Sequence, residues 1–405
     1  MAATESSLEA ALDVIWTSRT MKEQLYEKNR FLEKLKKTNK YTQGKEAKVP
    51  LHVSRNGGYT VLPPGGGTLN EAGNQGYDEA NFKLTHRHQQ VAIQGDILDI
   101  SADKAGSIVS AADEEITRAL NDMNRQLTRE SYMDGTARIA QCRTSDSNNV
   151  DLNTTSGRIA IERGWIFEGQ QVDVGTKTEE ATIVNGGVVT FVDDEKYAFT
   201  SSTGNVTTEG TTHYVSNKNS RSGETSFEMN GIRNVISETG TLGGLAPSVQ
   251  RQWKSTVNTT TTTLTIPALL TGQRKIRQKR GDDPTFLATG LLQQQKFYEL
   301  LQQQVHFGSD KGLTAGADQT TTWNGMEIFA DADCPDELLM MGHWEHLFML
   351  ETPSGAPYWQ NKHTGGEKLA WIQGSDSYGG KLAYRCQLGA DRRNDLYLFN
   401  ALATS

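Results

Sequence analysis

The chain has 405 residues, of which 36% are hydrophobic, so it can form a buried core in one large domain or in two to three ordinary domains. Its formal net charge of -8 disfavours a protein that wraps nucleic acid with its whole surface. No run of eighteen apolar residues occurs, and the N-terminus lacks the basic start and apolar middle of a secretion signal. These features favour a soluble, unsecreted globular protein.

The cysteine content also restricts the class of protein. Cys142, Cys334 and Cys386 are odd in number, far apart and outside any Cys-x-x-Cys pattern. This spacing argues against a disulfide framework and against a thiolate zinc site. A reducing compartment fits best.

The first predicted element is a helix over residues 5–40. Apolar residues recur along one stripe of it, namely Leu8, Leu12, Ile15, Trp16, Met21, Leu25, Phe31, Leu32 and Leu35. Residues 21–48 carry nine Lys/Arg against four Glu, which locally reverses the sign of an acidic chain. This segment is either a helix with a solvated charged face or an arm that lies near a polyanion.

The next stretch, residues 57–95, has too few apolar residues for a core of its own. Its sequence is GGYTVLPPGGGTLNEAGNQGYDEANFKLTHRHQQVAIQG. Pro63, Pro64 and three glycines prevent regular strand pairing at its start, and Lys83–Gln94 alternates weakly, as an exposed strand does. We expect a long two-armed loop that is ordered by contacts with a neighbouring subunit.

A long one-sided helix is predicted over Ala102–Met133. Ile116, Leu120, Met123 and Leu127 recur at intervals of four, three and four residues, with acidic residues early and basic residues late. Leu120 and Met123 are expected to face the core. The helix should end at Asp134-Gly135, because glycine adopts the left-handed conformation that commonly ends a helix.

The predicted secondary structure changes twice along the rest of the chain. Residues 137–235 show no helical period, and short segments such as RIAIERGWIF and THYVSN between turns predict a β-rich region. Residues 238–257 read as a connector, and a threonine run at 259–263 marks a further boundary. Beyond it we predict helices at 267–279 and 291–304, strands at 285–289 and 326–330, and two closing strands that end in YLFNALA.

Common catalytic signatures are absent from the sequence. It has no Gly-x-x-x-x-Gly-Lys-Ser/Thr loop, no Gly-x-Ser-x-Gly elbow and no His-Glu-x-x-His helix. His86/His88 and His343/His346 have spacings that metal ligands adopt, yet neither pair has a clear third ligand. Such histidines more often need only a hydrogen-bond partner.

Two further features have a functional and a structural interpretation. Asp331 and Asp333 in FADADCP suit a divalent cation, but aspartates after a buried strand usually accept hydrogen bonds from turn N–H groups. The aromatic residues in WEHLFML and PYWQ favour packing, because a platform for stacked bases needs interleaved basic residues. No nucleic-acid-binding module is evident.

The order of these elements resembles the tailed-bacteriophage major capsid protein family with the Hong Kong 97 fold. The resemblance spans nearly the whole chain. It is carried by ITRALNDMNRQLTRESYMDGTARIA, IAIERGWIFEGQQVDV, EMNGIRNVISETGTLGGL, WNGMEIFADADCP and LAYRCQLGADRRNDLYLFNALA. These motifs are structural, so the family supplies no active site.

The resemblance implies an α+β fold with the family's parts in chain order. These are an N-terminal arm (1–56), an extended loop (57–96), a spine helix with the start of the peripheral domain (97–164), a β-rich insertion in the peripheral domain (165–225), the rest of that domain with the connector (226–257), an axial domain (258–383) and closing strands (384–405). Trp165–Arg221 is longer than a plain hairpin requires, which is why we expect an inserted β-rich segment there.

The function implied is self-assembly into an icosahedral shell of hexamers and pentamers around double-stranded DNA. The chain would be a virion protein assembled in the host cytoplasm, with no enzymatic activity, cofactor, metal or membrane. Its partners would be other copies of itself, a separate scaffolding protein, portal and decoration proteins, and DNA held by non-specific contact. Only some fifty residues precede the loop, so a built-in scaffold is not expected. Without an evident acid catalyst, a covalent cross-link through Lys83 is not expected either.

Two sets of residues are predicted to make these contacts. The inter-subunit set is Tyr59, Val61, Leu62, Tyr77, Phe82, Leu84, Leu25, Leu32 and Leu35. The set that would face DNA is Lys22, Lys28, Lys34, Lys36, Lys37 and Lys40.

Two alternatives remain at this stage. One is an encapsulin-type bacterial compartment, a shell that holds an enzyme cargo and no genome; the basic stretch 21–48 favours genome contact instead. The other is a β-rich metal-dependent hydrolase that uses His86, His88, Asp331 or Asp333, against which the scatter of these residues counts.

Overall fold

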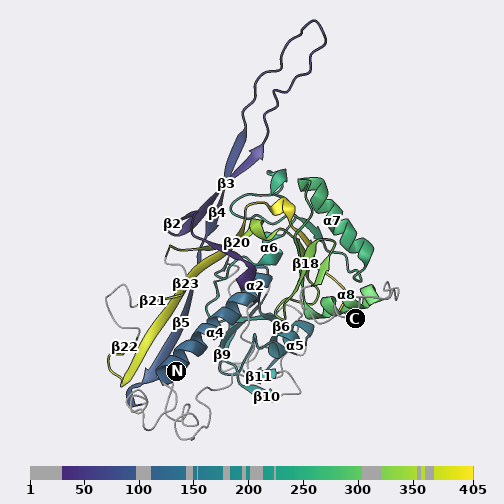
Figure 1. The fold of residues 1–405 in the computed structure, drawn as a ribbon. Helices are drawn as coiled ribbons and strands as arrows, with labels where there is room; N and C mark the ends of the chain where they lie inside the picture. The colour runs from purple at the N-terminus through teal and green to yellow at the C-terminus, as the bar shows by residue number, and fades with distance from the viewer. Residues whose placement is uncertain are drawn as a thin grey trace.

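A computed structural model describes residues 30–96, 111–142, 149–152, 154–176, 183–193, 198–200, 213–222, 225–302, 321–353, 357–360 and 369–404. Figure 1 shows a mixed body of helices and strands from which one long β-hairpin projects. The two largest sheets among the described residues have six strands each. In the described part of the chain, no helix is both long and apolar enough to cross a membrane.

The first sheet, called here the long sheet, is built on the fourteen-residue strand β23 (Ser377–Ala390). Strand β5 (Thr85–Gln94) runs antiparallel along one side of β23. The other side pairs with β20 (Leu347–Glu351), β21 (Tyr358–Trp359) and β22 (Ala370–Trp371). Helix α4 (Ala111–Tyr132) lies beside β5 (Figure 1).

The second sheet, called here the mixed sheet, has the order β15-β24-β19-β16-β18-β17. Its strands are β15 (Thr256–Asn258), β16 (Phe286–Thr289), β17 (Thr321–Trp323), β18 (Met326–Ala330), β19 (Leu339–Gly342) and β24 (Tyr397–Phe399). One face packs on helices α7 (Ile266–Arg280) and α8 (Leu291–Gln302). The other face joins the main core with Phe286, Ala288 and Met340. The expected alternation of helices and strands is confirmed.

Helix α7 shows how local sequence sets an element's limits. The side chain of Thr265 accepts a hydrogen bond from the N–H of Ala268, and Pro267 occupies the first turn, where its missing N–H costs nothing. Gly281 ends the helix with φ = 98°, a left-handed conformation that favours glycine.

Helix α4 (Ala111–Tyr132) confirms the predicted long helix over the described residues, and 102–110 lie outside them. Met123 and Leu127 are buried in the main core, as expected for Met123. Leu120 is only partly buried against that core. The chain leaves the helix at Gly135, whose φ is 76°, close to the predicted stop.

The predicted N-terminal helix is wrong at its C-terminal end. Helix α2 (Arg30–Lys34) stops early, and β1 (Lys36–Thr38) follows as a strand parallel to β20. Phe31, Leu32 and Leu35 are buried, as their apolar spacing predicted. After Leu35 the backbone pairs with the edge of β20, so the chain continues as a strand. Residues 1–29 lie outside the described part.

A short β2 (Thr42–Gln43) leads into the projecting hairpin, which consists of β3 (Glu46–Ser54) and β4 (Gly76–Lys83). The three strands form their own sheet. The expected strand at Lys83–Gln94 is confirmed as β5, but it belongs to the long sheet.

The β-rich region packs around a separate core that includes Trp165, Val172 and Val215. Its strands are β6 (Ala140–Cys142), β7 (Asn149–Asp151), β8 (Gln171–Thr176), β9 (Ile183–Val188), β10 (Phe191–Asp193), β11 (Ala198–Thr200), β12 (His213–Asn217), β13 (Arg221–Ser222) and β14 (Thr225–Ser226).

The expectation of no helix between residues 137 and 235 is wrong at two places. The segment RIAIE lies in α5 (Thr155–Glu162), whose start is capped by the side chain of Thr154 accepting from the N–H of Gly157. The second is the four-residue α6 (Ile232–Val235), which buries Ile232 and Val235.

Candidate assembly surfaces

The projecting hairpin keeps its two arms together beyond the last paired strand residues, Ser54 and Gly76. The Oδ1 atom of Asn56 accepts hydrogen bonds from the N–H groups of Gly58 at 2.8 Å and Gly73 at 3.0 Å. Further out, the Oγ1 atom of Thr60 accepts from the N–H of Asn70 at 2.9 Å. The tip is therefore cross-braced by side chains where the strand ladder stops.

The hairpin also exposes apolar side chains that the chain does not bury, all of them in the tip except that of Tyr77, which lies in β4. Tyr59 is 83% exposed, Val61 75%, Leu69 70% and Tyr77 76%, and Leu62 is also exposed. Several large apolar side chains exposed in one short segment make that segment a candidate interaction site. Leu69 was missed in the sequence, although it lies in the same coreless, glycine-rich stretch that drew attention to Tyr59 and Val61.

The base of the hairpin is anchored in the chain's own core. Phe82 and Leu84 are buried there together with Leu32 and Leu35. At Gly243, φ is 61° and an added Cβ would lie 2.9 Å from that of Ala80, so the connector approaches β4 closely.

The predicted inter-subunit residues fall into three groups: those buried within the chain, one outside the described residues, and those that are exposed. Phe82, Leu84, Leu32 and Leu35 are used within the chain, so their assignment as inter-subunit contacts is corrected. Leu25 lies outside the described residues. The candidate contact set now consists of Tyr59, Val61, Leu62, Leu69 and Tyr77.

The predicted DNA-facing lysines are placed only in part. Lys36 and Lys37 are exposed on β1. The Nζ atom of Lys34 lies 2.6 Å from Oε1 of Glu327, and that of Lys40 lies 5.6 Å from the ring centroid of Tyr41. Lys22 and Lys28 lie outside the described residues.

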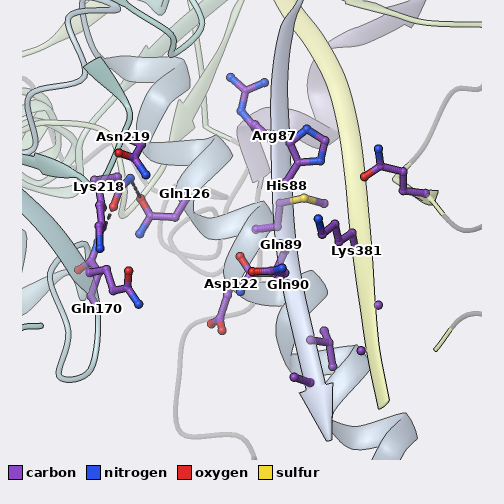
Figure 2. Close-up of a pocket in the computed structure, with 18 of the residues that line it drawn as sticks. Arg87, His88, Gln89, Gln90, Asp122, Gln126, Gln170, Lys218, Asn219 and Lys381 are labelled. Carbon is purple, nitrogen blue, oxygen red and sulfur yellow. Dashed lines mark hydrogen bonds between the residues drawn. The ribbon is translucent and has the colours of Figure 1, made fainter. Parts of the chain in front are cut away.

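A groove of about 1410 Å³ runs along β5 on the side of α4 and the β-rich region. Figure 2 shows Asp122 and Gln126 of α4 facing Gln170 and Lys218 across it. Polar side chains in its far wall are hydrogen-bonded to one another: Nε2 of Gln170 donates to Oδ1 of Asn217 at 2.7 Å. The groove is also lined by exposed apolar side chains, those of Phe167, Phe227, Trp371 and Ile372.

Strand β5 offers an edge to this groove. Within the described ranges it pairs with β23 alone, so its second edge has no strand partner there. His86 and His88 are exposed on one face of β5, and partial burial, with nearby Arg385, lowers the pKa of both. An unpaired edge beside a groove is suited to an extended segment from another chain.

Two buried ion pairs lie beside the groove, and three of their residues, Arg87, Glu130 and Glu228, line it. Arg87 of β5 pairs with Glu130 of α4, and Arg129 of α4 pairs with Glu228, which precedes the connector. Burial raises the pKa of Glu228; Arg129 opposes this shift and Glu130 adds to it. Breaking one such buried pair is costly because the other charge is left uncompensated, so these pairs hold α4, β5 and residue 228 in one arrangement.

The aspartates that suggested a metal site have structural partners. Oδ2 of Asp331 accepts from the Tyr132 hydroxyl at 2.8 Å, and its Oδ1 accepts from the N–H of Asp333 at 3.1 Å. Oδ1 of Asp333 accepts from Nε1 of Trp165 at 3.4 Å.

Neither histidine pair belongs to a group of potential metal ligands among the described residues. His343 and His346 each have a ring nitrogen 2.8 Å from an aspartate oxygen, on Asp395 and Asp391 respectively. Across the described residues, no group of three His, Cys, Asp or Glu side chains is arranged to hold a metal ion. The candidates for a hydrolase site are therefore not brought together.

Comparison with solved structures identifies the fold. The chain is similar to one in the structure "Cyanophage A-1(L) capsid asymmetric unit", with a TM-score of 0.57 and 12% identity over 95% of this chain and 96% of that chain. It is also similar to chains of native and empty GTA particle capsids, each with a TM-score of 0.54 and 10% identity; the matches cover 100% and 99% of this chain, and 99% of each of those chains. No protein-family model and no curated protein matches the sequence. The chain thus has the Hong Kong 97-type fold that the order of its elements predicted.

Proposed function

We propose that the chain is the major capsid protein of a tailed bacteriophage, which assembles into an icosahedral shell of hexamers and pentamers around double-stranded DNA. The observation that carries this proposal is the fold, which matches capsid chains from one end to the other. A fold permits more than one function, so the surfaces of this chain must also suit assembly.

The hairpin and the groove supply two complementary surfaces. The hairpin tip exposes Tyr59, Val61 and Leu69 without covering them. The groove presents half-exposed Phe167 and Trp371 beside the edge of β5 that has no strand partner in the described part of the chain. These are different patches of one molecule, so a contact between them is head-to-tail and generates rings when the rotation closes. Packing the tip of one copy on the groove of the next would build such a ring.

The proposal includes the chain's partners and location. Other copies of the chain are the main partner. A separate scaffolding protein, a portal, decoration proteins and DNA bound without sequence preference complete the set. The shell would assemble in the host cytoplasm and remain in the virion, and the chain would have no catalytic role.

Assembly is tested with a triple substitution in the tip, Tyr59→Ser/Val61→Ser/Leu69→Ser. We expect a folded chain that fails to form shells in electron micrographs and sediments as small species. The matched control is Val249→Ser/Leu270→Ser/Leu291→Ser, which removes apolar side chains exposed elsewhere. Normal shells from the tip variant would contradict the assembly role of the hairpin. A wild-type chain that stays monomeric at high concentration would contradict the proposal that the chain forms a shell.

The contents of the particle separate a virion from a cargo compartment. Shells isolated from cells that carry the whole set of virion genes should contain nuclease-protected double-stranded DNA. Shells that repeatedly hold a protein cargo and no DNA would favour the encapsulin-type alternative.

A further inference from the structure

Among the described residues, two segments carry the chain between the long sheet and the mixed sheet, and a third segment, which leads from the β-rich region into the mixed sheet, lies against them. The segment from the β-rich region is the connector, predicted at 238–257 and taken from the structure as residues 231–255; it contains α6 and the short 3-10 helix η1 (Arg251–Trp253) and leads into β15. The first crossing between the sheets is η3 (Trp344–His346), between β19 and β20. The second crossing is η5 (Arg393–Asp395), between β23 and β24.

The crossing at η5 is bonded to the connector through one buried arginine. Arg393 is fully buried, and its guanidinium donates to five main-chain carbonyl oxygens of the connector instead of to a carboxylate. The acceptors are Val235 at 2.7 Å, Gly240 at 2.9 Å, Asn234 at 3.1 Å, Ser237 at 3.3 Å and Trp253 at 3.4 Å. In return, the hydroxyl of Ser255 donates to the carbonyl of Arg393 at 2.8 Å.

The crossing at η5 is also bonded to the crossing at η3. Nδ1 of His343 lies 2.8 Å from Oδ2 of Asp395, and Nδ1 of His346 lies 2.8 Å from Oδ1 of Asp391. The N–H of Asp391 donates to the carbonyl of His346 at 3.3 Å. The approach is close: a Cβ at Gly342 would lie 3.1 Å from the carbonyl oxygen of Asp395.

We infer that residues 391–395 lock the connector and the two crossings together and thereby fix the angle between the long sheet and the mixed sheet. This inference rests on the proposed function where it concerns the shell: the angle sets how a subunit is bent, so the lock would keep the curvature of the shell uniform. The residues involved are Asp391, Arg393 and Asp395 with their partners in the connector and in η3.

The geometry explains why such a lock is stiff. Arginine presents five N–H donors in a rigid planar fork, and here the fork spans turns of the connector from Asn234 to Trp253. Rotating one sheet against the other would strip several of these bonds at once and leave a buried charge without partners. Trp344 of η3 adds a stacked contact, 3.9 Å between ring centroids, with Phe286 of the mixed sheet.

Arg393→Lys tests the lock because it keeps the positive charge and removes the fork. The matched control is Arg277→Lys, which makes the same change at an exposed pair with Asp283. We expect Arg393→Lys to increase hydrogen exchange at the amides of Ile236 and Trp253 at least tenfold in the unassembled chain. It should also broaden the distribution of particle diameters in micrographs, and Arg277→Lys should do neither.

A milder variant covers the case in which Arg393→Lys does not fold. His346→Gln breaks the pair with the half-exposed Asp391 and should loosen η3 against η5, with faster exchange at the amide of Asp391 and broader diameters. Unchanged exchange and wild-type diameters in the folded variant would overturn the inference. If the wild-type chain forms no shells, the proposed function fails, while the exchange measurement still decides whether the lock exists.

Discussion

At the scale of single residues, Gly231 lies where the connector touches the end of α4. A Cβ there would lie 2.1 Å from the carbonyl oxygen of Met133 and 2.4 Å from that of Glu130, and both are backbone atoms that cannot move aside cheaply. We therefore expect Gly231→Ala to lower the free energy of unfolding by on the order of 3 kcal/mol. Urea denaturation measures it, with Gly57→Ala as the control because nothing lies within 4 Å of its added Cβ. Equal stability of the two variants would contradict the close approach.

Asp333 makes the stability of the chain depend on pH. Burial, with a smaller contribution from Asp331, raises the pKa of Asp333 to about 6. Between about pH 4 and 6 the folded chain holds a proton that the unfolded chain has released, so the free energy of unfolding falls as the pH rises through this window.

Asp333→Asn removes this titration and keeps an oxygen for the bond from Trp165. We expect the variant to match the wild type near pH 4 and to exceed it above pH 6 by up to about 3 kcal/mol. Denaturant midpoints at both pH values measure the difference. A gap between the two chains that does not change with pH would show that Asp333 does not titrate in this window.

At the scale of elements, α4 tests how far a helical stripe predicts burial. Leu127 is 3% exposed, whereas Leu120 lies at the margin of the core. Leu127→Asp should cost about 3–5 kcal/mol because it buries an unpaired charge, and Leu120→Asp should cost about 1–3 kcal/mol because water reaches that position. Thermal unfolding of the two variants shows which substitution lowers the stability more. A larger loss at Leu120 would contradict the orientation of the helix.

The elements that sequence predicted well are those whose limits are set locally. The stripe of α4 and the Thr265 cap and Gly281 stop of α7 are properties of neighbouring residues. The failures have non-local causes. The backbone at Lys36 pairs with β20, some three hundred residues away, so an apparent helix continues as a strand. At α5, the cap by Thr154 decides for a helix in a segment whose apolar residues also suit a strand.

At the scale of the whole molecule, the order of elements was sufficient to predict the fold, and the sequence pointed to one candidate surface, the coreless loop, but not to the groove. The coreless loop was recognisable because proline, glycine and exposed apolar residues coincide at Val61–Gly67. The groove was not, since Phe167, Gln126 and His88 come together only when the long sheet, α4 and the β-rich region pack. Arg393 likewise gave no signal: its five acceptors are main-chain oxygens, which no side-chain pattern records.

The same scale includes the proposed contact with the genome, which was inferred from the basic N-terminal stretch. Lys36 and Lys37 are exposed on β1 and take part in the fold through their backbone, so replacing their side chains should leave the subunit intact. Lys34 is unsuitable because it pairs with Glu327. The variant is therefore Lys36→Glu/Lys37→Glu, extended in a second chain to Lys22 and Lys28.

Attraction between lysines and phosphate is independent of sequence and falls steeply with salt. We therefore expect both variants to form empty shells at the normal yield, to package DNA less often, and to show this defect most strongly at low salt, where the wild-type attraction is largest. The ratio of filled to empty particles in a density gradient measures the effect. Lys83→Glu/Arg251→Glu is the control, since it reverses exposed charges outside the N-terminal stretch. Filled particles at the wild-type ratio would show that the lysines are solvated positions on an arm whose only role is within the protein shell.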